Sequence, residues 1–279
     1  MIRSTIGQNH PSRVGYRLLS FSLIFCTVSA LFISPTNAQS FDSVMHIHSA
    51  KAIGGKVFLG THNGLFEFVG QNNMKPIGTD PFDTMGLAVY GSTLFASGHP
   101  APGSKLPEPL GLLRSDDLGK SWKQISLQGK VDFHFLQAGK SELYGADAQS
   151  GDLMYSANLG KSWRSVGKNR FSDIAISNQK VERAYAVEKG KLLLSNDALK
   201  TQTIIKTGFE VGAIEAVGKI LYAASGKDIY SSQDEGKSWK KLNSFKAVVS
   251  DITASEQIIA AIVGSEVLIS RDKGKSFKR

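Results

Sequence analysis

The chain has 279 residues, a formal net charge of +9 at pH 7 and a single cysteine. One cysteine excludes an intramolecular disulfide framework, and the basic residues form no long runs of the kind that favour nucleic acid as a partner. The length is sufficient for one domain, or one closed array of repeats, with a substantial hydrophobic core.

The N-terminal region has the order of a secretory signal peptide. Arg3, Arg13 and Arg17 precede an apolar run at residues 18–33, and small residues follow before Gln39. The run is shorter than the roughly 20 residues that cross a membrane as a helix. We therefore expect residues 1–38 to be a signal peptide, the protein to be exported to the periplasm or secreted, and the mature chain to have no transmembrane span. A retained membrane anchor is the alternative.

One eight-residue phrase recurs along the rest of the chain, at Ser115–Trp122, Ser156–Trp163, Ser232–Trp239 and Ser270–Phe277. A degenerate copy begins at Ser195, and an upstream segment matches the strands of a further unit. Short segments rich in Ile, Leu, Val and Tyr separate the copies and are typical of strands. Repeats spaced by about 40–50 residues are typical of propeller blades.

We therefore predict that residues 39–279 form an all-β domain, a six-bladed β-propeller of four-stranded antiparallel blades. Seven blades is the alternative count. The last unit ends soon after its octet, so its outer strand is expected to be short, and residues 41–44 are candidates to complete it.

The octet falls between the third and fourth strands of each unit, where the chain must reverse. Its acid can accept hydrogen bonds from turn amides, its glycine supplies a positive φ, and its aromatic residue packs against the turn. Asn158 replaces the acid in the second copy and keeps an acceptor. We assign a structural role to Ser115, Asp117, Gly119, Trp122, Asn158, Trp163, Asp197, Asp234, Gly236, Trp239, Asp272 and Phe277.

The pattern S-x-D-x-G-x-S-W, as in "SDDLGKSW" and "SQDEGKSW", resembles the Asp-box, or BNR, repeat of sialidases and of many secreted bacterial propellers. The string "HIH…THNGLF…SGHPAPGS…DFH" is similar to a bacterial subgroup labelled sialidase-like or glycosyl hydrolase. The resemblance implies the propeller fold. It does not imply sialidase activity, because the arginine triad and the first-blade R-I-P motif of sialidases are absent from the sequence.

The histidines are not part of the repeat. His46 and His48 begin the first strand of unit one, His134 begins the first strand of unit three, and His62 and His99 end the second strands of units one and two. In an antiparallel meander these positions lie at the same end of a blade. We therefore expect all five side chains at one mouth of the central channel, opposite the octet turns.

Clustered neutral imidazoles favour a transition metal, and we predict a copper or zinc site at this mouth. Asp132 lies two residues before His134, and Met85 begins the inner strand of unit two, where a thioether would favour copper. Polar channel residues without a metal are the alternative interpretation. The predicted ligands are His46, His48, His62, His99 and His134, supported by Asp132 and Met85.

Three functions compete on this basis. The leading hypothesis is an exported, monomeric binding module with a metal site. The second is a hydrolase or lyase acting on glycans at the same face, with Asp80, Asp83, Asp132 or Asp147 as acid and base. The third is a scaffold for protein assembly with an acidic protein partner. The sequence leaves open whether the protein is an enzyme.

Overall fold

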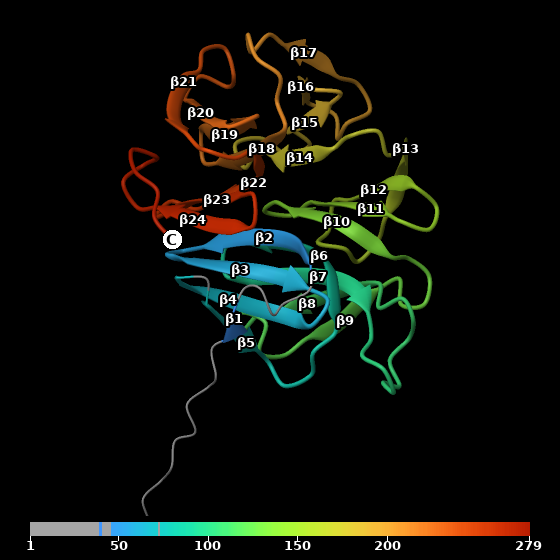
Figure 1. The fold of residues 1–279 in the computed structure, drawn as a ribbon. Helices are drawn as coiled ribbons and strands as arrows, with labels where there is room; N and C mark the ends of the chain where they lie inside the picture. The colour runs from blue at the N-terminus through green and yellow to red at the C-terminus, as the bar shows by residue number, and fades with distance from the viewer. Residues whose placement is uncertain (1–38, 41–45, 72) are drawn as a thin grey trace, which may run out of the picture. The chain divides into compact units, whose positions relative to one another are not determined.

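The computed structural model describes residues 39–40, 46–71 and 73–279 (Figure 1). The predicted signal peptide at 1–38 and the segment 41–44 lie outside the described residues. Within these ranges no helix is long and apolar enough to cross a membrane. The described secondary structure consists of antiparallel strands and the turns that join them.

The strands form six sheets in chain order, and each sheet is one blade. Blade 1 contains β1 (Gln39–Ser40), β2 (Ile47–Ile53), β3 (Lys56–Thr61), β4 (Gly64–Gly70) and β5 (Asn73–Ile77), and blade 2 contains β6 (Asp83–Tyr90), β7 (Thr93–His99), β8 (Leu112–Ser115) and β9 (Lys123–Ser126). Blade 3 contains β10 (Phe133–Ala138), β11 (Leu143–Asp147), β12 (Asp152–Ser156) and β13 (Arg164–Lys168), and blade 4 contains β14 (Asp173–Ile176), β15 (Ala184–Glu188), β16 (Lys191–Ser195) and β17 (Thr203–Ile205). Blade 5 contains β18 (Ala213–Val217), β19 (Ile220–Ser225), β20 (Asp228–Ser232) and β21 (Lys240–Ser244), and blade 6 contains β22 (Val249–Ala254), β23 (Ile259–Val263) and β24 (Glu266–Ser270).

The blades close into a ring around a central channel. The inner strands β2, β6, β10, β14, β18 and β22 follow one another, and β22 of blade 6 lies against β2 of blade 1 (Figure 1). The amide of Ala52 donates to Thr253 Oγ1 at 2.9 Å across this closure. The structure is a six-bladed β-propeller, so the sequence prediction of six blades is confirmed and the alternative of seven is wrong.

Hydrophobic side chains from neighbouring blades hold the ring together. At the closure, Val57 and Phe66 of blade 1 pack in one buried cluster with Ile258 and Val267 of blade 6. Burial of each such side chain contributes roughly 1.5–3 kcal/mol relative to exposure. The core of this protein therefore lies between blades rather than within any one of them.

Blade 6 has a short outer edge, as its sequence predicts. Beyond the three strands β22–β24 it has only an isolated bridge between Ile269 and Lys278. The N-terminal strand β1 pairs instead with β5, at the outer edge of blade 1. The segment expected to complete blade 6 is outside the described residues.

The octet turns share one set of hydrogen bonds. Ser115 Oγ donates to Asp117 Oδ1 at 2.7 Å and accepts from Gly119 N at 2.8 Å, while Ser121 N donates to Asp117 Oδ1 at 2.9 Å. The same bonds recur in the turns at 156–162, 195–201, 232–238 and 270–276. Each acid, or Asn158, therefore fixes its own turn.

The degenerate copy keeps this geometry without its glycine. Leu199 has a φ of 60°, close to the value of 83° at Gly160, although leucine is strained in this region. Its side chain is buried in the core, which offsets the strain. The aromatic residues at the end of the other octets are half-buried, and Trp239 Nε1 donates to Gly236 O at 3.0 Å.

The octet turns and the histidines lie at opposite ends of the blades. Ser115, the first residue of its octet, pairs with Leu94 at the start of β7, whereas His99 ends the same strand and pairs with Asp83. One face of the ring therefore carries the repeated turns, and the other carries the non-repeated residues.

Candidate functional site

A β-bulge interrupts the inner strand of each of the first three blades at the same place. The pairing shifts between Ile47 and Ser49 in β2, between Thr84 and Gly86 in β6, and between Phe133 and Phe135 in β10. The extra residues are His48, Met85 and His134. A bulge bends the strand and redirects the side chain of its extra residue. The backbone thus presents these three residues equivalently around the channel mouth.

Two residues before each bulge, the chain carries a second equivalent residue. These residues are His46, Asp83 and Asp132. A third equivalent position follows from pairing with the second strand: Asp83 pairs with His99, and the corresponding residue of blade 1 is His62. Three positions per blade therefore converge at this end of the channel.

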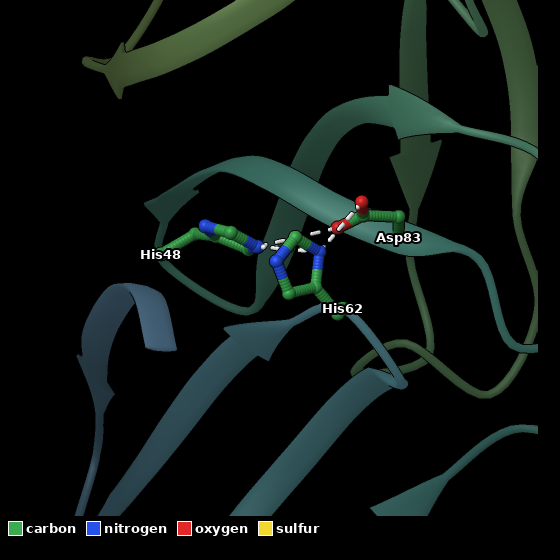
Figure 2. A group of neighbouring side chains, drawn as sticks. All are labelled: His48, His62 and Asp83. Atoms are coloured by element: carbon green, nitrogen blue, oxygen red, sulfur yellow. Dashed lines mark hydrogen bonds and ion pairs between the residues drawn. The ribbon is translucent and has the colours of Figure 1, made fainter. Parts of the chain in front are cut away.

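The first group of side chains lies between blades 1 and 2 and comprises His48, His62 and Asp83 (Figure 2). His48 Nε2 lies 3.2 Å from His62 Nδ1 and 3.3 Å from Asp83 Oδ1. His62 Nδ1 lies 2.8 Å from Asp83 Oδ2. The two rings are nearly perpendicular, with centroids 4.2 Å apart.

Three electron-pair donors face one another in this group. A proton on His62 Nδ1 can bond the carboxylate, but that nitrogen then cannot accept from His48. Burial lowers the pKa of His48, and the neighbouring His62 lowers it further. His48 is therefore neutral at pH 7, with an electron pair available at a ring nitrogen.

His46 lies beside this group without belonging to it. Its ring centroid is 5.6 Å from that of His62, its side chain is exposed, and its backbone has a positive φ of 53°. The position of His46 is equivalent to that of Asp83, one blade earlier.

The second group lies between blades 2 and 3 and comprises His99, Asp132 and His134. Asp132 Oδ2 lies 2.9 Å from His134 Nε2 and 3.6 Å from His99 Nε2. The Asp132 side chain is only 7% exposed, and its Oδ1 is buried without a hydrogen-bond partner among the described residues. On the far side of His99, Nδ1 lies 2.5 Å from Glu108 Oε1.

The charge around His99 favours its protonated form in the metal-free protein. Burial lowers the pKa of His99, but the hydrogen bond with Glu108 and the nearby Asp132 carboxylate outweigh burial and raise it above its ordinary value. The pKa values of His48 and His99 are therefore shifted in opposite directions, although both residues lie at the same mouth.

The structure brings all five predicted histidines to one mouth of the channel, with His48 and His62 in the first group, His99 and His134 in the second, and His46 beside the first. Asp132 stands with His134, as expected. Met85 occupies the bulge of β6, one blade from each of the bulges that carry His48 and His134. The metal prediction missed Asp83, although "DTM" aligns with "HIH" and "DFH" at the three bulges and could have revealed it.

Two other carboxylates named as candidate acids or bases have different roles. Asp147 is buried, and it accepts hydrogen bonds from Asp132 N at 3.0 Å and Ser150 N at 3.1 Å. Asp80 is exposed on the loop before β6. Asp147 therefore stabilises its own turn and the start of blade 3.

A cavity of about 330 Å³ occupies the channel mouth, and His48 and His134 are part of its wall. The inner strands of the other blades contribute Ser172, Gly212 and Ser250 to the same wall. An external ligand could therefore approach both histidine groups from this cavity.

The inner strands also carry three carboxylates and one amine along the channel, and Asp173, Asp251 and Lys51 are part of the wall of the mouth cavity. Asp173 Oδ2 accepts from Ile214 N at 2.7 Å, which links blades 4 and 5. Burial raises the pKa of Asp173 to about 7, and the nearby Asp251 carboxylate adds to the rise. Burial also raises the pKa of Glu215, while the nearby amine of Lys51 opposes the rise. Three acids share this channel with one base, so their carboxyl groups keep their protons to a higher pH than exposed carboxyl groups do.

Comparison with known proteins identifies the fold and no closer relationship. No family model matches the chain, and no curated protein matches it. Among solved structures, the chain is similar to YCF48 bound to D1 peptide, with 18% identity, a TM-score of 0.51, and coverage of 89% of this chain and 85% of that one.

Two larger proteins contain a similar propeller. The GH74 enzyme of Niastella koreensis has 15% identity, a TM-score of 0.56, and coverage of 85% of this chain and 37% of the enzyme. The extracellular domain of BT4673 from B. thetaiotaomicron has 12% identity, a TM-score of 0.51, and coverage of 81% and 33%. The chain thus spans about a third of the length of each of these proteins, and the likeness is one of fold alone.

Proposed function

We propose that this protein is an exported propeller of the Asp-box type that binds one copper or zinc ion through His48, His62 and Asp83, and that it acts as a metal-dependent binding module. The observation that carries the proposal is the convergence of two imidazole nitrogens and a carboxylate, separated by 2.8–3.3 Å. Bonds of about 2.0–2.1 Å to a tetrahedral zinc ion separate its ligands by about 3.3 Å. The donor atoms therefore need to move little to share an ion.

The chemistry of the donors supports the same class of ion. Imidazole suits zinc and copper, whereas calcium and magnesium prefer sets of oxygen ligands. Three protein ligands leave a coordination position for an external ligand, as in zinc sites that act on bound molecules. His48 is part of the wall of the mouth cavity, which has room for a small molecule or the end of a chain.

Two further features support the wider proposal. The apolar run at residues 18–33, with arginines before it and small residues after it, favours export. Five turns with one hydrogen-bond set favour assignment to the Asp-box type, in which the repeated phrase is architectural. A glycan or an acidic protein is the expected class of external ligand.

The carboxylate-pair hydrolase is the weaker proposal. Asp147 is fully engaged by its turn, while Asp83 and Asp132 are each held by histidines. A hydrolase that uses a metal-bound water is compatible with the first group, and hydrolysis of a glycan that stops on chelation would favour it.

Metal titration of the purified protein tests the proposal. We expect Zn²⁺ or Cu²⁺ affinity at the first group to fall by on the order of 100-fold or more in His48→Ala and His62→Ala. His46→Ala is the matched control, because it removes an imidazole from the same mouth but from neither group, and its affinity should stay close to that of the wild type. Equal loss in all three variants, or no binding by the wild type, would overturn the proposal.

A further inference from the structure

The arrangement that builds the first group recurs one blade further round the ring. His62 directly follows β3 and His99 is the last residue of β7, so both lie where the second strand of a blade ends. Asp83 and Asp132 both stand two residues before the bulge residue of the next blade. Each group thus combines a second-strand histidine with the carboxylate of the following blade. The repeat places the same pair of ligand types at two successive interfaces.

The bulge residues supply a third side chain in both cases. His48 approaches the first group from the blade of its own His62, whereas His134 approaches the second group from the blade of Asp132. The second group therefore has the same composition as the first, two imidazoles and one carboxylate. Its third side chain comes from the later of the two blades, whereas in the first group it comes from the earlier one.

The carboxylate of Asp132 is the strongest sign that the second group holds a ligand. Its side chain is 7% exposed, and one of its oxygens is buried without a hydrogen-bond partner in the described part of the chain. Leaving a buried polar atom unpaired is unfavourable, and more so when the group is charged. The unpaired atom is Oδ1, while Oδ2 faces both histidines, so a cation bound by both oxygens of the carboxylate would satisfy the orphan atom and engage the imidazoles.

His99 is also oriented as metal-bound histidines are. Glu108 holds its Nδ1 at 2.5 Å, which leaves Nε2 directed at Asp132. A carboxylate on the other ring nitrogen commonly fixes the tautomer and raises the basicity of a ligating histidine. Glu108 belongs to the proline-rich loop that follows β7, and that loop is anchored where Leu110 N donates to Gly98 O at 2.9 Å. The loop therefore supplies the carboxylate that orients His99.

We infer that His99, Asp132 and His134 bind a second transition-metal ion, zinc or copper, and that Glu108 is a positioning residue for His99. This ion would lie at the interface of blades 2 and 3 and uses no side chain of the first group. The second site can therefore exist whether or not the first is occupied.

Zn²⁺ stoichiometry of the metal-stripped, purified protein provides the test, with metal measured by elemental analysis after dialysis against a fixed free Zn²⁺ concentration. We expect two ions per chain in the wild type and one in His99→Ala, His134→Ala, His48→Ala and His62→Ala. Far-UV circular dichroism and thermal unfolding of each variant check that the ring is intact. Asp132→Asn keeps the shape of its side chain and should also reduce the count to one.

The positioning role of Glu108 has its own readout. Glu108→Gln should keep two ions at saturation but weaken one of them by about 10–100-fold, the range for partners that orient a ligand. Glu67→Gln, which removes an acid that pairs with Lys56 away from this mouth, is the matched control and should change neither ion. If the two substitutions changed the Zn²⁺ affinity equally, Glu108 would not be a positioning residue for His99.

The stoichiometries separate this inference from the proposed function. One ion that is lost in the His48 and His62 variants and kept in the His99 and His134 variants would overturn the second site and leave the first. The reverse pattern would overturn the first and support the second. One ion lost in all four variants would indicate a single shared ion, and no bound ion would overturn both.

Discussion

Asp83 and His99 are directly paired on neighbouring strands β6 and β7, yet their side chains belong to different groups. Asp83 completes the group with His48, and His99 belongs with Asp132. The two groups are therefore joined through a single backbone pairing. Any change in how β6 and β7 approach each other at this end must affect both.

Gly98 makes this approach possible and provides a prediction. It has a φ of 148°, and a Cβ at this position would lie 1.8 Å from Asp83 O. Gly98→Ala should therefore separate the strand ends and lower metal binding at both groups at once. Gly91→Ala in the hairpin at the other end of the same strands is the matched control, because its Cβ would meet nothing within 4 Å.

The measurement is Zn²⁺ stoichiometry of the folded fraction of both variants. Alanine at Gly91 also adopts a positive φ, at 61°, so both substitutions carry backbone strain and only one blocks the strand pairing. If the two variants bind the same amount of metal, the coupling through this pairing is wrong.

Metal affinity should depend on pH through the histidines. Imidazole ligands must be neutral, and their unperturbed pKa is about 6.5. Because the pKa of His48 is lowered, protonation of His48 should weaken Zn²⁺ binding at the first group only as the pH falls below about 6.5. Isothermal titration with Zn²⁺ between pH 5 and pH 8 measures this, and an affinity that rises on acidification would contradict it.

Asp173 predicts a second pH dependence, in stability rather than in binding. Its pKa is raised to about 7, above the roughly 3.9 of an unfolded chain, so the folded state holds its proton more tightly. The stability that comes from this proton is complete below about pH 4 and is lost as the pH rises through about 7. Asp173→Asn has no such proton to lose.

Urea unfolding at several pH values between 5 and 8 checks this prediction. The free energy of unfolding of the wild type should decrease across this range more steeply than that of Asp173→Asn. Asp251 and Glu215 also have raised pKa values, so some slope should remain in the variant. Identical slopes in the two proteins would show that Asp173 is charged throughout.

Export gives the fourth prediction. Protein isolated from the periplasm or the medium should begin at Gln39, because small residues precede that position after the apolar run. Intact-mass measurement of the isolated protein decides this. A mass that includes residues 1–38 would instead support the retained anchor.

The sequence predicted the architecture because the repeat determines it locally. Each octet contains the residues that close its own turn, so the copy that begins at Ser115 and the one that begins at Ser270 fold alike without reference to the rest of the chain. The spacing of the copies then gives the number of blades. Local signals of this kind can be recognised from the sequence alone.

The sequence alone did not predict how the histidines are grouped, because the grouping depends on distances between blades. The sequence predicted that the histidines lie at one mouth of the channel. The same sequence positions are consistent with one shared ion and with two separate groups. Asp83 joins His48 from the next blade, and this becomes visible only when the bulges of β2 and β6 are aligned. Nor did any motif predict the partner of His99, since Glu108 lies in a loop without regular structure.

The inner-strand bulge at the channel mouth recurs in blades 1, 2, 3 and 6, while the side chains around the mouth differ from blade to blade. Two of the first three blades contribute His48 and His134 to its wall, whereas the last three contribute Asp173 and Asp251 beside the small residues Ser172, Gly212 and Ser250. A molecule that reaches across the opening therefore meets imidazoles on one side and carboxylates among small residues on the other. An asymmetric molecule would be held in a single direction, so this ring can distinguish the two ends of a ligand as well as its size.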